Sequence, residues 1–238
     1  VISFVIFIIF LGFLYSIISP IKVQENKEAI LNQLEKEIED KLSANLISSS
    51  INIPGDYTWA CFQVEHPINF EEGLNVIVKD ENEIPVRFGL IATSDKKYLR
   101  IDGTPNKRTF KIYYSEKKFE DFPLATSSEE GCTFETGGYH LETEDNPIKQ
   151  VGLIRTEKYI FETKVRDAFA NDDAYQEVKE SLDVPYGSDF SFSFTFNDKT
   201  PLGFEDKKVS TNVYAREIPV QYVDRQANIV LGYLNVKV

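Results

Sequence analysis

The chain has 238 residues and a formal net charge of −12 at pH 7, from 38 acidic side chains against 26 Lys and Arg. Its length allows one or two domains with a buried core. The charge is acidic, and the sequence contains no run of Lys and Arg of the kind that binding to nucleic acid or to an anionic lipid surface requires, so we expect neither partner.

The first 21 residues, Val1 to Ile21, contain no charged side chain. As a helix with ~1.5 Å of rise per residue, this segment would be roughly 30 Å long, about the hydrocarbon thickness of a bilayer. Its large apolar side chains surround the helix, so lipid or other helices should cover every side. These candidate assembly residues are Val1, Ile2, Phe4, Ile6, Phe7, Ile9, Phe10, Phe13, Leu14 and Ile17.

Two further features concern the shape of this segment and the way its N-terminus arises. Pro20 lacks the N–H that would bond to the carbonyl of Ser16, which predicts a kink there. The chain contains no Met, so Val1 is expected to be a processed end, or residues precede it. No charged region or small-residue cleavage site precedes the apolar run, so a retained secretory signal is not expected, and a plain membrane anchor remains an alternative.

An amphipathic helix is expected from Lys22 to Ser50. Ile30, Leu34, Ile38, Leu42 and Leu46 recur every four residues, opposite mainly charged positions. The serines at 48–50 and Pro54-Gly55 should end it. The stripe would pack on the chain's own sheet, on other subunits, or on both.

The chain beyond Pro54 alternates between strand patterns and turns. We expect strands at 57–64, 74–78, 86–93, 98–101, 109–114, 151–166, 189–196, 209–223 and 228–238, and a surface loop at 115–131. One short helix, capped by Asn171 or Asp172, precedes the strand with Phe190, Phe192, Phe194 and Phe196 on one face.

These elements predict an α+β fold: a long N-terminal helix, apolar and then amphipathic and kinked near Pro20, on a β-rich, β-sandwich-like head. The expected domains are 1–50, the helical assembly or membrane arm, and 51–238, the extracellular head.

Cys61 and Cys132 are the only cysteines. In an exported β-rich head they favour a disulfide, while two buried free thiols are an alternative. Zinc binding with the only histidines, His66 and His140, would need C-x4-H and C-x7-H spacings, which differ from the usual structural zinc patterns.

We find no sequence motif for catalysis. A glycine-rich phosphate loop, G-x-S-x-G and H-E-x-x-H are all missing from the sequence. We therefore expect no enzyme, no cofactor and no metal, and acidic clusters such as Glu142–Asn146 are interpreted as solvated loops rather than calcium sites. No residue indicates which ligand the head would bind.

The apolar start VISFVIFIIFLGFLYSIISPI, followed by the amphipathic segment Lys22–Ser50, resembles the N-terminal helix of archaeal type IV pilins. The strand DFSFSFTF and the terminal NIVLGYLNVKV are also similar to pilin-type exported proteins. The resemblance implies a non-enzymatic structural subunit of an extracellular filament on the cell surface, with a role in adhesion or surface contact. Its implied partners are copies of itself, the membrane before assembly and the pilus assembly machinery.

The sequence departs from the bacterial members of this class. Those pilins begin with a methylated Phe and carry Glu at the fifth position, where this chain has Val1 and Val5. An alternative is a single-span membrane-anchored or minor pilin-like protein that does not form the main filament. An adhesin head that binds a sugar or a host surface is compatible with either interpretation.

Overall fold

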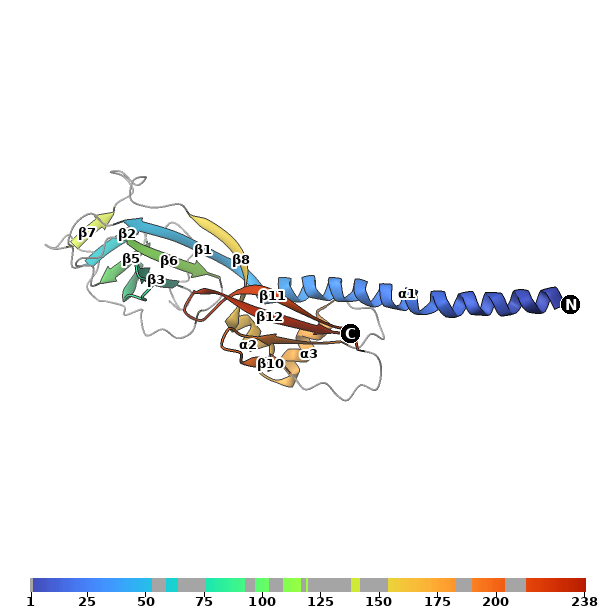
Figure 1. The fold of residues 1–238 in the computed structure, drawn as a ribbon. Helices are drawn as coiled ribbons and strands as arrows, with labels where there is room; N and C mark the ends of the chain where they lie inside the picture. Colours follow the sequence, from blue (N-terminus) through green and yellow to red (C-terminus); the bar gives the residue numbers. More distant parts are fainter. Residues whose placement is uncertain are drawn as a thin grey trace. The chain divides into compact units, whose positions relative to one another are not determined.

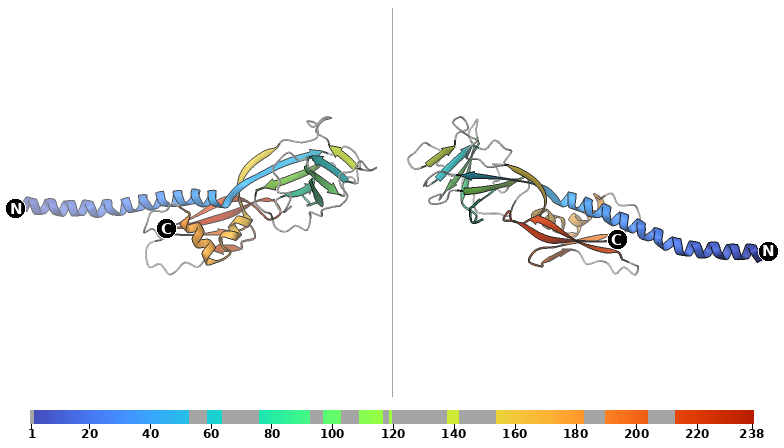
Figure 2. Two further views of the ribbon diagram at one scale, coloured as in Figure 1. Left: turned by 180° about the vertical axis from the view of Figure 1, so that it is seen from behind. Right: turned by 45° about the horizontal axis from the view of Figure 1, so that its top comes forward.

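The computed structural model describes residues 2–52, 59–63, 76–92, 97–102, 109–116, 119, 138–141, 154–182, 190–203 and 213–238 (Figures 1 and 2). The helices are α1 (Ile2–Leu42), α2 (Glu162–Ala168) and α3 (Asp172–Glu180). The strands are β1 (Ser43–Asn52), β2 (Trp59–Gln63), β3 (Val76–Asp80), β4 (Phe88–Ala92), β5 (Lys97–Asp102), β6 (Thr109–Ser115), β7 (Gly138–Leu141), β8 (Arg155–Phe161), β9 (Ser191–Thr195), β10 (Pro201–Gly203), β11 (Ala215–Val223) and β12 (Ile229–Lys237).

The strands form two sheets. One has eight strands in the order β10-β9-β12-β11-β8-β1-β6-β3, and the other has four in the order β4-β5-β2-β7. Most neighbouring strands are antiparallel, but β11 pairs with β8 in parallel and β2 with β7 in parallel. The chain divides into two compact units: unit 1 is 1–42, 166–220 and 231–238, and unit 2 is 43–165 and 221–230.

The α+β class with a β-sandwich-like head is wrong, because the fold is mostly β. Its largest element is the eight-stranded sheet, which draws strands from Ser43 to Lys237. Helix α1 belongs to the same compact unit as residues 166–220 and 231–238, and the division into an assembly arm, 1–50, and a head, 51–238, stays a prediction. Helix α1 continues through Pro20 without a break.

The helix predicted to reach Ser50 ends at Leu42, and Ser43–Asn52 form β1 instead. Strand β1 pairs with β6 on one side and β8 on the other, so its backbone groups are bonded at both edges. Serine-rich sequence has little preference for helix, and this double pairing decides in favour of strand. Leu46 is buried as the spacing predicted, but from a strand.

In the C-terminal half of the chain, two predictions are confirmed and one is wrong. Asn171 caps α3, its Oδ1 accepting a hydrogen bond of 2.8 Å from the Ala174 N–H. The four alternating phenylalanines of the β9 region are buried, as predicted. The predicted strand 151–166 is wrong at its end, because Glu162–Ala168 form α2.

The core of unit 1 is rich in aromatic side chains. Phe192 of β9 packs against Phe169 and Tyr175, with ring centroids 5.2 and 5.1 Å away. The Tyr175 hydroxyl also accepts a hydrogen bond from the Phe192 N–H at 3.2 Å. Buried Phe194 is in register with buried Leu234 of β12. Tyr175 thereby joins α3 to the phenylalanine strand.

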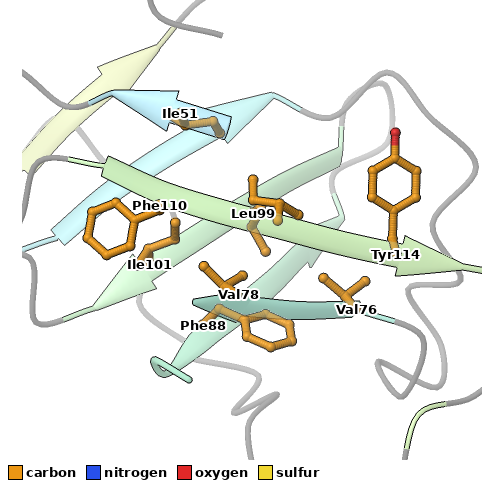
Figure 3. Close-up of a cluster of buried hydrophobic side chains, with 9 residues drawn as sticks. Ile51, Val76, Val78, Phe88, Leu99, Ile101, Phe110 and Tyr114 are labelled. Carbon is orange, nitrogen blue, oxygen red and sulfur yellow. The ribbon is translucent and has the colours of Figure 1, made fainter. Parts of the chain in front are cut away.

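The core of unit 2 lies between strands of the two sheets (Figure 3). Val76 and Val78 of β3 and Phe110 of β6 meet Phe88 of β4 and Leu99 of β5. All five side chains are at most 2% exposed. A second buried cluster in the same unit contains Leu46, Ile77, Phe119, Phe161, Val223 and Ala227.

Candidate assembly surface

The candidate site is the exposed apolar part of α1 between Ile6 and Phe13, which we call the apolar segment. Its large side chains are between 44% and 67% exposed: Ile6, Phe7, Ile8, Ile9, Phe10, Leu11 and Phe13. Eight consecutive helical residues make more than two turns, so these side chains point to all sides of the helix. A contiguous exposed apolar surface of this kind marks a place where another apolar surface binds.

The C-terminal half of α1 differs from the apolar segment in both burial and charge. Ile30, Leu34, Ile38 and Leu42 are at most 8% exposed. This half of α1 runs beside β11 and β12 (Figures 1 and 2). One end of the helix is therefore fixed in unit 1 through its own apolar face.

Polar contacts align this half of the helix with the edge of β11. The Arg216 guanidinium donates to Asn32 Oδ1 at 2.5 Å and to Glu35 Oε2 at 3.4 Å. The Lys27 ammonium lies 4.9 Å from the centre of the Tyr214 ring. These groups are partly exposed, so they orient α1 more than they stabilise it.

Five of the predicted assembly residues lie in the apolar segment with their side chains described: Ile6, Phe7, Ile9, Phe10 and Phe13. The others are not placed to the same extent: Ile2, Phe4, Leu14, Ile17 and Pro20 lie within α1, but their side chains are outside the described part, and Val1 is outside it altogether.

Ile8 and Leu11 also belong to this surface but were not among the predicted residues. They are 50% and 44% exposed. The sequence could have identified them, because a helix that is apolar on all sides has no polar face. Every large side chain on such a helix is then a candidate for the assembly surface.

The physical role open to the apolar segment is association rather than chemistry. Burying one large apolar side chain from water contributes about 1.5–3 kcal/mol. Among the residues that the structure describes, no helix combines the length and the apolar character needed to cross a membrane.

The described residues include only some of the side chains named in the cysteine and metal predictions. Cys61 is 1% exposed and takes part in a disulfide. Cys132, the other cysteine of the sequence, and His66 lie outside the described residues, so the pairing stays a prediction. Within the described part of the chain, no group of three or more His, Cys, Asp or Glu side chains is arranged to hold a metal ion.

Comparison with protein-family models, curated proteins and solved structures found no match to this chain.

Proposed function

We propose that this chain is the structural subunit of an extracellular filament of the archaeal type IV pilus kind, and that it polymerises through the apolar segment of α1. The observation that carries the proposal is the exposure of seven large apolar side chains on all sides of one helix end. Water is a poor environment for such a surface, and copies of the same helix are a matching one.

The mechanism is an exchange of apolar surroundings. Before assembly, the membrane holds the N-terminal helix and the rest of the chain lies outside the cell. During assembly, the pilus machinery transfers the helix from lipid to a bundle of identical helices. An interface that joins one copy to the next without closing on itself yields a fibre rather than a ring.

The C-terminal half of α1 supports this division of roles. Because Leu34 and Ile38 are fully buried within unit 1, that half is committed to its own chain. Among the side chains of α1 that the structure describes, the large exposed apolar ones lie between Ile6 and Phe13 and are available to other copies. In the filament, the N-terminal half of α1 would then lie in the core, and the C-terminal half would lie in the outer part of each subunit.

The first experiment compares the full chain with a chain that begins at Lys22. Each is purified in detergent, the detergent is removed by dialysis, and the samples are examined by negative-stain electron microscopy and sedimentation. The full chain is expected to form fibres, and the shortened chain to stay monomeric. Fibres from the shortened chain would contradict the proposal.

A point substitution separates the apolar segment from the helix as a whole. Phe10→Glu places a charge where the exposed phenylalanine lies, and a buried unpaired charge in a helix bundle is strongly unfavourable. It should abolish fibres. Lys36→Glu, at an exposed position on the same helix, is the matched control and should leave them intact.

The competing function is a membrane-anchored surface protein that does not form the main filament. The same apolar segment would serve it, so the distinction is experimental. Mass spectrometry of filaments sheared from the cell surface should identify this chain as the main component. If the chain is found only in the membrane fraction, the anchored alternative replaces the filament.

A further inference from the structure

Unit 2 contains a buried lysine. Lys79 of β3 is 1% exposed, although charged side chains are rarely buried so completely. Val76 and Val78 point into the core between the two sheets. The alternation along a strand places Lys79 on the other face with Ile77, which belongs to the second buried cluster.

The amine of Lys79 lies against the loop that joins β11 to β12. Its Nζ donates to Asn228 Oδ1 at 2.7 Å and to the Ala227 carbonyl oxygen at 3.2 Å. Ala227 has a φ of 57°, so the backbone takes a left-handed turn at the residue whose carbonyl faces the amine. The amine is therefore held next to the amide group of one particular asparagine.

A carboxylate holds the other end of that amide. Asn228 Nδ2 donates to Asp224 Oδ2 at 2.8 Å. The second carboxylate oxygen, Asp224 Oδ1, accepts from the backbone N–H groups of Gln226 and Asn228, each at 2.8 Å. An amine, an amide and a carboxylate thus form a fixed row of three.

Burial and the charges around Lys79 act on its proton in opposite directions. Burial lowers the pKa of Lys79, while the nearby carboxylates of Glu83 and Asp224 act in the opposite direction. The Tyr113 ring, whose centre lies 5.1 Å from Nζ, makes a cation–π contact that favours the charged form. A lysine amine that loses its proton becomes a nucleophile.

We propose that Lys79 and Asn228 join in an intramolecular isopeptide bond, with Asp224 carrying the proton. The uncharged Lys79 Nζ attacks Asn228 Cγ, and a C–N bond forms between them. Once this bond has formed, Nζ and Nδ2 are attached to the same carbon, and Asp224, which already accepts from Nδ2, takes the proton from Nζ and gives it to Nδ2. The Cγ–Nδ2 bond then breaks and ammonia leaves, with no change in oxidation state and no further reactant.

The bond would tie together two parts of unit 2 that are 149 residues apart in the sequence. It would close β3 covalently onto the β11–β12 loop. A cross-link over so long a loop removes much of the freedom of the unfolded chain. This inference does not depend on filament formation, and it would hold for the anchored alternative as well.

The test is the mass of the full chain, purified in detergent, and of its tryptic peptides. The expected result is a chain lighter by one ammonia molecule than its sequence and disulfide require, and a branched peptide that contains both Lys79 and Asn228. Cyclisation of an asparagine to a succinimide also releases ammonia, but it leaves the two peptides separate. Separate peptides with both residues intact, after prolonged incubation at pH 8, would overturn the proposal.

Variants assign the roles of the three side chains. Lys79→Met and Asn228→Ser remove the amine and the amide, and each should give a chain with no ammonia lost. Asp224→Asn keeps the size of the side chain and should slow the reaction at least tenfold in a time course after refolding. If Asp224→Asn reacts as fast as the natural chain, Asp224 is not the proton carrier and the mechanism fails.

Two controls guard against general effects of substitution. Lys237→Met and Asn235→Ser change a lysine and an asparagine elsewhere on β12 and should keep both the mass loss and the branched peptide. Circular dichroism of every variant shows which of them fold. Retention of the branched peptide in the controls, together with its loss in folded Asn228→Ser, assigns the bond to this pair.

Discussion

At the scale of single residues, three hairpin loops of this chain share one backbone geometry. In the loop 80–84, the Asp80 N–H donates to the Ile84 carbonyl at 2.9 Å and the Glu83 N–H to the Asp80 carbonyl at 3.0 Å. The loops 196–200 and 224–228 repeat both hydrogen bonds. The fourth residue of each loop has a left-handed φ, as expected for a three-residue hairpin loop with its last residue in that region.

None of these left-handed positions is a glycine: they are Glu83, Lys199 and Ala227, with φ of 61°, 66° and 57°. A side chain makes this conformation unfavourable by roughly 1–2 kcal/mol. At Ala227 the same turn directs a carbonyl toward Lys79, so the strain accompanies a specific contact. At Lys199, no contact among the residues that the structure describes accounts for it.

Lys199→Gly should therefore stabilise the protein. Lys199 is exposed, and glycine adopts a left-handed φ without steric strain. Relief of that strain, reduced by the greater freedom of glycine in the unfolded chain, leaves a gain of about 0.5–1 kcal/mol. Urea unfolding of the full chain in detergent measures the change.

The control for this substitution is Gln226→Gly, in the loop of the same geometry. Gln226 is exposed and is not among the residues with a left-handed φ. Only the entropic cost of glycine remains there, about 0.5–1 kcal/mol in the destabilising direction. If both glycine variants shift stability in the same direction, backbone strain at Lys199 is not the cause.

At the scale of elements, α1 is held to unit 1 by two kinds of contact that differ in strength. Leu34 is fully buried, and removing most of its side chain should cost about 2–5 kcal/mol. The Arg216 side chain is 35% exposed, and its contacts with Glu28 and Glu35 are 3.6 and 3.4 Å long. Such exposed ion pairs contribute less than about 1 kcal/mol.

Leu34→Ala should therefore release α1 from unit 1, whereas Arg216→Ala should not. Hydrogen exchange of the amides between 28 and 42 measures the release, because those amides exchange faster once the helix leaves its sheet. A faster exchange in Arg216→Ala than in Leu34→Ala would mean that charge, not burial, fixes the helix.

The sequence predicts well those elements whose local pattern agrees with their final surroundings. The alternation around Phe192 and Phe194 has one meaning, a strand with one buried face, and β9 is that strand. The cap at Asn171 is equally local, since its bond reaches only to Ala174.

The secondary-structure predictions fail where pairing with strands distant in the sequence determines the structure of a segment. Leu46 continues the four-residue spacing of the preceding helix, yet its segment pairs with β6 and β8 and forms a strand. A different error affects Glu162–Ala168: the predicted strand extends past Phe161 into a segment rich in helix-favouring Glu, Lys, Arg and Ala, which forms α2.

The candidate sites show the same limit. The apolar character of the segment around Phe7 and Phe10 is evident from the sequence, but its exposure depends on what the fold leaves uncovered. The row of Lys79, Asn228 and Asp224 has no local signal at all, because the lysine and the asparagine are brought together only by the fold. Sequence spacing identifies neither the buried amine nor its neighbour.

At the scale of the whole molecule, charge and apolar surface are separated along the chain. The net charge is −12, and none of the charged side chains lies before Lys22. Copies that associate through their apolar segments must therefore bring their acidic parts close together. Repulsion between these parts opposes assembly, whereas the burial of apolar side chains drives it.

This opposition predicts that salt promotes assembly. The Debye length falls from about 30 Å at 0.01 M salt to about 8 Å at 0.15 M, so repulsion between copies is screened while apolar burial is not weakened. After removal of detergent, the concentration of chain left unassembled should fall severalfold across this range, as measured by sedimentation. Assembly driven by ion pairs between copies would show the reverse, a rise in unassembled chain with salt. The Phe10→Glu variant should stay unassembled at both salt concentrations, because screening does not restore the lost apolar contact.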